Sequence, residues 1–212
     1  GSFYQPEIVI TDVKVLNSLP HREIICGYAE ILKASLIDSQ NSFNYLNKNI
    51  INILSLKSNY IEKAILNSCK LKKKIVEKDE KESNLRKVLN LGHTFAHAYE
   101  SSLNFSKKLN HGEAVILGMK TALKFSLKNN LLKNKEYNSI INHISNSNLP
   151  SNIKKFFKIT DLNKILSFML KDKKNNSDKI NLVLLKKIGQ PIINKNYKRN
   201  NLKIFLRKEL LN

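Results

Sequence analysis

Two histidines four residues apart, in the segment NLGHTFAHAYE at 90–100, are side chains whose type and spacing could do chemistry. A third histidine, His111, follows a short way downstream in LNHGEA. Neutral imidazoles bind divalent metal ions, and a single imidazole can instead transfer protons. His93 and His97 are therefore either two metal ligands or one ligand and one catalyst, and their spacing alone does not decide which.

These histidines belong to the polar face of a predicted helix over 85–102. At about 100° per residue the polar residues of this stretch share one narrow face, and apolar residues cover the others. Such faces are usually solvated, but this one holds two of the chain's five histidines and no lysine. We therefore expect it to line a cleft. The residues on this face are Glu82, Arg86, Asn90, His93 and His97.

A carboxylate usually accompanies histidines at a metal, and Glu30 in GYAEILK is the candidate. Its neighbours on the predicted helix over 21–37 are small or apolar, so burying an unpaired carboxylate there would be costly. A metal would relieve that cost, but so would Lys33, as an ordinary helix-surface pair one turn away. Three arrangements stay open from spacing alone: two ligands on one helix, Glu30 with two histidines, or no metal.

The net charge raises a different hypothesis, because 37 Lys and Arg against 17 Asp and Glu give +20. A field of that sign attracts polyanions such as nucleic acid. The lysines, however, are spread through the chain among asparagines and do not form one basic stripe interleaved with aromatic residues. A basic nucleic-acid-binding module is therefore kept only as an alternative.

Composition and cysteine content indicate a globular chain in a reducing compartment. Hydrophobic residues make up 42% of the 212 residues, and two cysteines, Cys26 and Cys69, cannot build a disulfide framework. The sequence contains no charged-then-apolar leader and no apolar run long enough to span a bilayer. We expect a cytoplasmic protein that does not enter a membrane.

Apolar periodicity predicts a mainly α fold with a few short strands. An extended segment over 1–20, with a strand near 7–11, leads into a helical domain over 21–212, which has a late strand near 180–185. Between its strands and helices the chain has no Gly-rich phosphate loop, so a dinucleotide site is not expected within it. The predicted helices cover 21–37, 41–56, 57–78, 85–102, 112–129, 134–148 and 161–171.

Four blocks of this sequence, in order, resemble the signature of 3-dehydroquinate synthase: LPHREIICGYAEILK, DEKESNLRKVLNLGHTFAHAYE, LNHGEAVILGM and DKK…INLVLLKKIG. The resemblance runs from residue 3 to about 190. It implies the helical carboxy-terminal domain of the dehydroquinate synthase-like fold, which binds metal and substrate. The amino-terminal half, where the family binds NAD, is not in this chain. The family also implies a homodimer.

Carried over position by position, the resemblance implies a role for each candidate residue. His97 and Glu82 match the proton-transfer positions, so His97 is not a ligand. Ala96 stands where the family usually has glycine, and VLNS at 15–18 matches an NAD-lining segment only loosely. The metal positions are Glu30, His93 and His111; the substrate positions are Lys33, Lys72, Arg86, Asn90 and one of Lys173 and Lys174; the NAD-lining positions are Val15, Leu16, Asn17 and Ser18.

The activity that this resemblance implies belongs to the shikimate pathway. The family converts the seven-carbon keto-acid phosphate DAHP into 3-dehydroquinate and phosphate, with NAD and Zn²⁺ (or Co²⁺) as cofactors. The steps are transient oxidation, phosphate elimination, reduction and intramolecular aldol closure. A related sugar-phosphate cyclase is the alternative, but Arg86 and Asn90 fit the dehydroquinate branch better. Without its other half, this chain is expected to be inactive.

Overall fold

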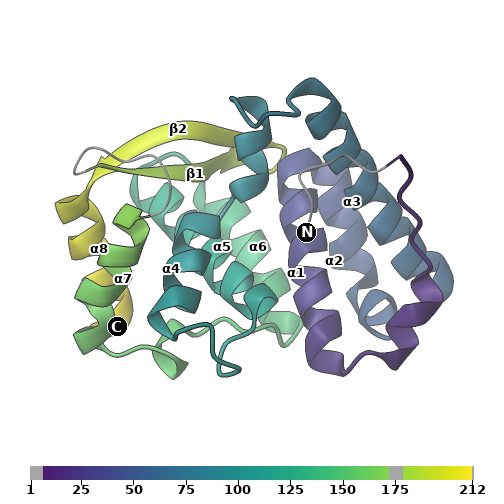
Figure 1. Ribbon diagram of the computed structural model, residues 1–212, viewed down its shortest axis with the longest axis horizontal. Helices are drawn as coiled ribbons and strands as arrows, with labels where there is room; N and C mark the ends of the chain where they lie inside the picture. Colours follow the sequence, from purple (N-terminus) through teal and green to yellow (C-terminus); the bar gives the residue numbers. More distant parts are fainter. Residues whose placement is uncertain (1–6, 172–178, 212) are drawn as a thin grey trace.

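The structure is a computed structural model and describes residues 7–171 and 179–211. Helix α5 (His111–Lys128) lies at the centre of the molecule (Figure 1). Apolar residues occur on all sides of this helix, so all its sides must be covered by other elements. Ala114, Val115, Ile116 and Leu123 are completely buried there. A helix that is apolar all round is stable only when neighbours cover it. Segments from both ends of the chain therefore pack around α5.

Three helices from the first part of the chain form one side of the molecule (Figure 1). They are α1 (His21–Asp38), α2 (Gln40–Leu54) and α3 (Ser58–Lys78). The break between α1 and α2 is set by Ser39, whose Oγ accepts a hydrogen bond of 3.2 Å from the N–H of Ser42. This cap satisfies a free donor at the start of α2. Of these three helices, α1 packs most extensively against α5.

The remaining helices pack on α5 or around it. Helix α4 (His93–Ser102) lies directly against α5, and α6 (Asn134–Asn146) packs on α5 from another side. Helices α7 (Leu162–Lys171) and α8 (Arg199–Leu211) lie beyond α4, far from α2 and α3 (Figure 1). The short 3-10 helices of the described residues are η1 (Val13–Ser18), η2 (Leu85–Asn90), η3 (Ile153–Lys155) and η4 (Ile159–Asp161).

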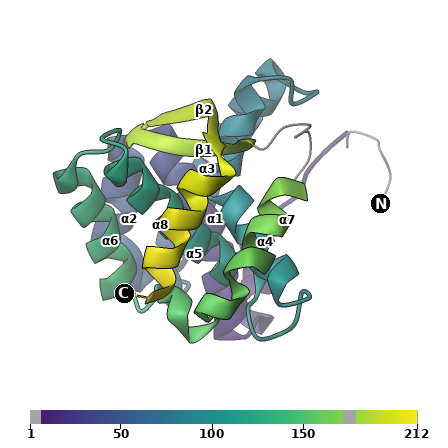
Figure 2. The same cartoon turned by 90° about the vertical axis from the view of Figure 1, so that its left-hand side faces the viewer.

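An antiparallel hairpin, β1 (Lys179–Lys187) and β2 (Gln190–Lys198), lies across the top of the helices in both ribbon views (Figure 2). Its turn contains Gly189, whose φ of 80° lies in the left-handed region that glycine adopts without strain. Buried and partly exposed side chains alternate along the first half of β1, and Ile180 and Leu182 are buried. The buried face of the strand covers α5.

The mainly α fold expected from the sequence is confirmed, and the strand expected near 180–185 lies within β1. The helical periods locate α1, α2, α3, α5, α6 and α7 to within a few residues. Strand β2 and helix α8 lie outside the predicted elements. Pro191 and the Asn- and Lys-rich composition of β2 disfavour a strand, and pairing with β1 overrides that preference.

The strand predicted near residues 7–11 is wrong. The apolar side chains of this stretch are exposed: Ile8 by 72%, Val9 by 75% and Ile10 by 82%. The sheet of the described residues contains only β1 and β2, so the stretch has no neighbour with which to pair. Nor is the segment up to residue 20 extended throughout, because the Asp12 carboxylate accepts a hydrogen bond from the N–H of Lys14 and begins η1.

The continuous helix predicted over 85–102 is also wrong. Residues 85–90 form the 3-10 helix η2, and Gly92 then adopts a φ of 79° before α4 begins at His93. A Cβ at Gly92 would lie 2.5 Å from the backbone nitrogen of Met119. The chain therefore breaks here because the start of α4 lies almost in contact with the backbone of α5.

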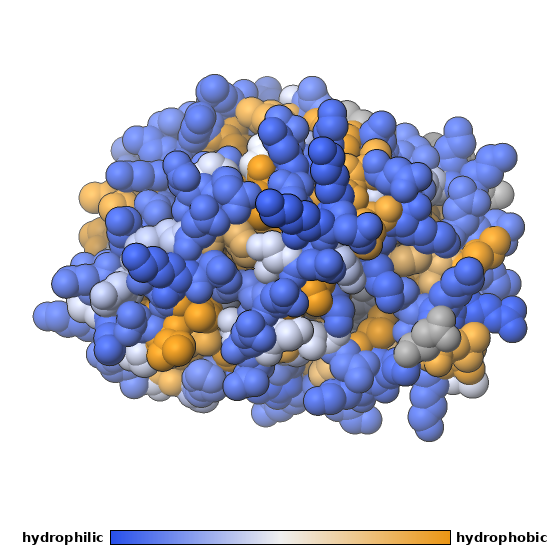
Figure 3. Space-filling view, turned by 180° about the vertical axis from the view of Figure 1, so that it is seen from behind, coloured by the Kyte–Doolittle hydropathy of each residue, from blue (hydrophilic) through white to orange (hydrophobic). Residues whose placement is uncertain are grey.

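The face opposite to that of Figure 1 is mainly hydrophilic. It carries only separate apolar patches among polar side chains (Figure 3). No described helix is both long and apolar enough to cross a lipid bilayer.

One buried histidine ties three helices together. The Nε2 atom of His143 on α6 lies 2.7 Å from the hydroxyl of Tyr28 on α1, and its Nδ1 lies 3.0 Å from Oδ1 of Asn47 on α2. An amide oxygen only accepts, so Nδ1 carries the proton and Nε2 accepts from the tyrosine. Burial lowers the pKa of His143 to about 4, and the ring is therefore neutral at pH 7.

This histidine should make the fold sensitive to acid. The unfolded chain takes up the proton near pH 6.5, whereas the folded protein takes it up near pH 4, so this contribution to stability is complete above pH 6.5 and is lost as the pH falls. Between pH 7.5 and pH 5 the loss should be about 2 kcal/mol. Urea unfolding of metal-free protein at both pH values measures it. The drop should shrink in His143→Gln, and an equal drop in both proteins would contradict the assignment.

Candidate functional site

The first contact that builds the site is a close approach of α1 and α5. A Cβ at Gly112 would lie 2.2 Å from Cα of Cys26, so only glycine allows this separation of the two backbones. His111 immediately precedes Gly112, and Glu30 follows Cys26 by one helical turn. The approach therefore places the first residue of α5 beside the carboxylate of α1.

A second close approach, between α5 and the start of α4, brings His93 to the same region. A Cβ at Gly118 would lie 2.4 Å from the carbonyl oxygen of Gly92, the residue before His93. Ala96 is fully buried at this crossing, with its methyl group facing the hydrogen atoms of Gly118. The extra methyl at Ala96 is thus accommodated because its neighbour on α5 has no side chain.

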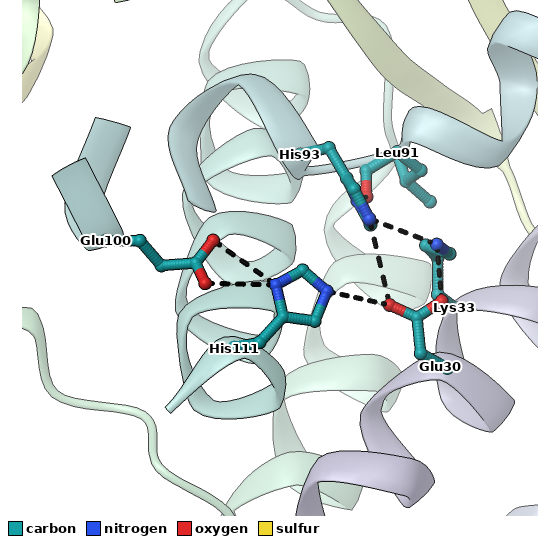
Figure 4. A network of polar contacts seen from close by, with 6 residues as sticks. All are labelled: Glu30, Lys33, Leu91, His93, Glu100 and His111. Atoms are coloured by element: carbon teal, nitrogen blue, oxygen red, sulfur yellow. Dashed lines mark hydrogen bonds and ion pairs between the residues drawn. The ribbon is translucent and has the colours of Figure 1, made fainter. Parts of the chain in front are cut away.

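Glu30, His93 and His111 converge where these helices meet (Figure 4). One ligand atom from each lies within 4.8 Å of the other two, the only such group that the described residues offer. Oε1 of Glu30 is 3.7 Å from Nε2 of each histidine. That oxygen is buried and lacks a hydrogen-bond partner in the described structure. A carboxylate and two imidazoles around an unsatisfied buried oxygen are a donor set that fits Zn²⁺.

The protonation states in this group suit a metal. Burial raises the pKa of Glu30, but the contacts with His111 and Lys33 outweigh it and lower the value to about 2. Burial and the nearby Lys33 ammonium lower the pKa of His93 to about 4. The pKa of His111 is raised, chiefly by its contact with Glu30. An ionised carboxylate therefore faces one firmly neutral imidazole and one that gives up its proton more readily once a cation is near.

The simpler explanation of Glu30, a pair with Lys33, is present but incomplete. Nζ of Lys33 lies 2.6 Å from Oε2 of Glu30 and 3.3 Å from Nε2 of His93. The lysine side chain is only 8% exposed and that of Glu30 is 43% exposed, so the pair is half-buried and not a fully solvated helix-surface pair. It satisfies Oε2 of the carboxylate and leaves Oε1 without a partner.

A cavity of about 410 Å³ adjoins this group. Lys72 from α3 approaches Lys33 closely enough to lower its pKa, an effect added to that of burial. Like charges gathered around a cavity favour an anionic ligand. Most of the predicted substrate and proton-transfer residues line this cavity together with Glu30: Lys33, Lys72, Glu82, Arg86 and Asn90.

His97 lies near the centre but does not belong to the three-residue group. Its ring centroid is 5.3 Å from that of His93 and 6.5 Å from that of His111. The side chain is exposed, one turn along α4 from His93. The geometry thus favours Glu30 with two histidines from separate helices over two ligands on one helix.

Asp79, at the end of α3, was missed by the sequence reasoning. Its buried carboxylate accepts hydrogen bonds from the backbone N–H groups of Ser83, Asn84 and Arg86 at 2.8 to 2.9 Å. These bonds lower its pKa well below the usual range. They fix the loop in which Glu82 adopts a φ of 55° and accepts a hydrogen bond from Asn90. Aspartate side chains commonly accept hydrogen bonds from nearby backbone N–H groups in turns, and here the donors follow Asp79 by four to seven residues.

Glu100 is the second residue that was missed. Both oxygens of its buried carboxylate lie 3.1 to 3.2 Å from Nδ1 of His111. It follows His97 by three residues in HAYE, a spacing that puts both on neighbouring turns of α4. The spacing of His97 and Glu100 can be read from the sequence. The contact of Glu100 with His111 on α5 cannot, because it depends on how the two helices pack.

Two groups of predicted residues remain to be located. Lys173 and Lys174 lie outside the described residues. Val15, Leu16, Asn17 and Ser18 form most of η1, and Leu16 lines a separate apolar cavity of about 200 Å³ between α1 and α3. A role of this segment beside NAD stays a prediction.

The fold is shared with two solved synthases. 2-epi-5-epi-Valiolone synthase from Streptomyces hygroscopicus subsp. jinggangensis 5008, solved with NAD⁺ and Zn²⁺ bound, superposes with a TM-score of 0.79. It is 19% identical, and the match covers 93% of this chain and 54% of that one. 2-Deoxy-scyllo-inosose synthase, complexed with carbaglucose-6-phosphate, NAD⁺ and Co²⁺, gives a TM-score of 0.75 at 21% identity over 93% of this chain and 55% of its own. The fold is thus one that such synthases use for about half their length.

The sequence narrows this class to one family. The 3-dehydroquinate synthase of Pelagibacter ubique (strain HTCC1062) is 58% identical over 99% of this chain and 57% of its own length. That of Alkaliphilus metalliredigens (strain QYMF) is 40% identical over 87% of this chain and 50% of its own. The family described as 3-dehydroquinate synthase C-terminal matches residues 27–175. The chain belongs to this family, and it spans about half the length of the curated relatives it matches.

Removing the Asp79 carboxylate should loosen the loop that carries Glu82. Asp79→Ala leaves three backbone N–H groups without their acceptor, so amide exchange over residues 83–86 should accelerate on the order of tenfold. Hydrogen-exchange mass spectrometry measures this. Asp161→Ala is the matched control, because its carboxylate caps the N–H of Lys158 at 2.8 Å in another part of the fold. Unchanged exchange over 83–86 in Asp79→Ala would refute the role given to Asp79.

Proposed function

We propose that this chain is the metal- and substrate-binding half of a 3-dehydroquinate synthase. The observation that carries the proposal is the convergence of Glu30, His93 and His111 next to a cationic cavity. The identity of 58% to a 3-dehydroquinate synthase supports this reaction over that of the related cyclases, which are 19% and 21% identical to this chain. The complete enzyme would convert DAHP into 3-dehydroquinate and phosphate.

Glu30, His93 and His111 would hold the metal, Zn²⁺ or Co²⁺, through one carboxylate oxygen and two Nε2 atoms. Three protein ligands leave a tetrahedral metal with one open position, as catalytic sites require. When bound, the metal would supply Lewis acidity and a template for neighbouring hydroxyl groups of the substrate. The buried Oε1 of Glu30 supports this assignment, because a cation satisfies it without any rearrangement of α1.

The cationic residues of the cavity would bind the phosphate and carboxylate groups of the substrate. Lys33 and Lys72 come from different helices and face the same space, so an anion between them relieves their mutual repulsion. The planar guanidinium of Arg86 can bind a carboxylate or phosphate through two parallel hydrogen bonds. Its NH1 already donates to the carbonyl of Glu80 at 2.6 Å, which holds the side chain in place.

His97 and Glu82 would move protons. His97 lies beside the candidate metal ligands without belonging to their group, and an imidazole has one nitrogen that donates a proton and one that accepts it. Glu82 lies at the mouth of the cavity, and Asn90 Nδ2 donates to its Oε1 at 2.9 Å. That bond orients the carboxylate and leaves its other oxygen available to accept a proton from substrate.

NAD would supply the transient oxidation, bound mainly by an amino-terminal half that this chain does not contain. The longer curated relatives support such a half. The homodimer and the cytoplasmic location remain predictions. Both cysteines are free thiols, as a reducing compartment would require.

The ligand assignment predicts which histidines the metal needs. His93→Ala and His111→Ala should each lose most bound zinc, whereas His97→Ala should keep it, because His97 lies outside the group of three. Elemental analysis of protein purified without chelator measures the stoichiometry, and circular dichroism checks that each variant folds. Zinc loss in His97→Ala equal to that in His93→Ala would refute the division of roles.

The activity is tested by joining this chain to the half of a relative that it does not match. In a chimera, this chain replaces the part of the Pelagibacter ubique enzyme to which it is 58% identical, and the amino-terminal half of that enzyme is kept. The chimera should release phosphate from DAHP in the presence of NAD. His97→Ala in the chimera should lower kcat by about 10² to 10⁴ while zinc is retained. A folded, zinc-loaded chimera without activity would count against the proposed reaction.

A further inference from the structure

His111 is the most exposed of the three candidate ligands, and its orientation needs an explanation. Its side chain is 52% exposed, against 12% for His93 and 43% for Glu30. It is the first residue of α5, so no preceding helical turn packs against its ring. An exposed imidazole can rotate, and it can carry its proton on either nitrogen.

The carboxylate of Glu100 restrains this ring. Both of its oxygens contact Nδ1 of His111 (Figure 4), and its side chain is only 11% exposed. Among the described residues, His111 is the only hydrogen-bond partner of the Glu100 carboxylate. A carboxylate buried to this degree is costly unless a donor satisfies it, so Glu100 requires the proton of His111 to lie on Nδ1.

The ring of His93 is oriented in the same way, but by a backbone acceptor. Its Nδ1 faces the carbonyl oxygen of Leu91 at 3.4 Å, while its Nε2 faces Oε1 of Glu30. In both histidines, therefore, Nδ1 points to an oxygen acceptor and Nε2 points to the unsatisfied oxygen. The acceptor is a backbone carbonyl for His93, whose side chain is mostly covered, and a side-chain carboxylate for the more exposed His111.

We propose that Glu100 is a positioning residue, which holds His111 in the tautomer with the proton on Nδ1 and so presents the Nε2 lone pair to the metal. This inference rests on the metal centre of the proposed function. An acceptor behind a ligating histidine fixes its ring and raises its basicity, and loss of such a partner typically costs 10- to 100-fold in metal affinity. A carboxylate supplies this acceptor more strongly than a neutral amide.

Zinc affinity of the 212-residue chain, measured by competition with a chromophoric chelator, tests the proposal. Glu100→Ala should bind zinc about 10- to 100-fold more weakly than wild type. Glu100→Gln should lie between the two, because its amide oxygen still accepts from Nδ1 but carries no charge. The matched control is Glu209→Gln. Glu209 is a carboxylate only 16% exposed, paired with Lys124 at 2.8 Å outside this site, and its replacement should leave zinc affinity unchanged.

The tautomer itself provides a second measurement that does not depend on zinc. In metal-free protein near pH 8, ¹⁵N NMR of the His111 ring should report the Nδ1–H form in wild type. Glu100→Ala should shift the population toward the Nε2–H form, and Glu100→Gln should restore part of the wild-type population. A folded Glu100→Ala with wild-type tautomer and wild-type zinc affinity would overturn the inference.

The two measurements separate this inference from the proposed function. If wild type binds no zinc, or if His111→Ala binds it as well as wild type, the metal centre is wrong, and the tautomer result still decides the role of Glu100. If zinc affinity falls in His111→Ala but is unchanged in Glu100→Ala, the metal centre stands and only the positioning role is wrong. If Glu100→Ala does not fold, the comparison of Glu100→Gln with Glu209→Gln decides.

Discussion

The contact of the α1 and α5 backbones at Cys26 and Gly112 is the constraint on which the candidate site depends. Any side chain at Gly112 would overlap Cα of Cys26, so a larger residue would push α5 away from α1. Because His111 and Glu30 lie within one turn of that contact, their separation is set by the backbones and not by flexible side chains. The crossing of Gly92 and Gly118 does the same for His93. Ligands placed by backbone contact need little reorganisation when a metal binds.

The buried charges follow from this geometry. Glu30 sits among apolar and small residues on α1, and burial there disfavours the charged form of every group nearby. The Lys33 ammonium compensates one oxygen of Glu30, and the imidazoles of His93 and His111 stay too far from the other oxygen to hydrogen-bond it. The site is therefore electrostatically incomplete in the protein alone, which is what distinguishes it from an ordinary buried ion pair.

Local pattern predicted most helices, the late strand and the histidines and Glu30 as candidate residues, because amphipathic periods and residue types are local properties, whereas candidates such as Lys72 came only from the family resemblance. It did not predict the break at Gly92, since that break exists only where α5 passes within contact distance. The prediction that one long helix carries this polar face was therefore wrong, although η2, α4 and the loop that carries Glu82 bring the same residues close to one another. The choice among the three metal arrangements came from family resemblance, because Glu30 and His111 are remote in sequence. Glu100 was missed for the same reason: its partner lies across a loop on another helix.

The distribution of charge around the candidate site favours a ligand that carries two anionic groups. With one carboxylate and two neutral imidazoles, a divalent metal would leave a net charge of about +1 at the centre. Lys33, Lys72 and Arg86 add further positive charge around the adjoining cavity. Glu82, at its mouth, is hydrogen-bonded to Asn90 and not paired with any of these cations in the described structure. Burial already lowers the pKa of Lys33, and the nearby Lys72 adds to that shift.

A ligand that carries both a phosphate and a carboxylate would neutralise the cluster, whereas a neutral polyol would leave the repulsion in place. The anionic groups would thus provide binding energy far from the atoms that react, and that energy can orient the hydroxyl groups at the metal.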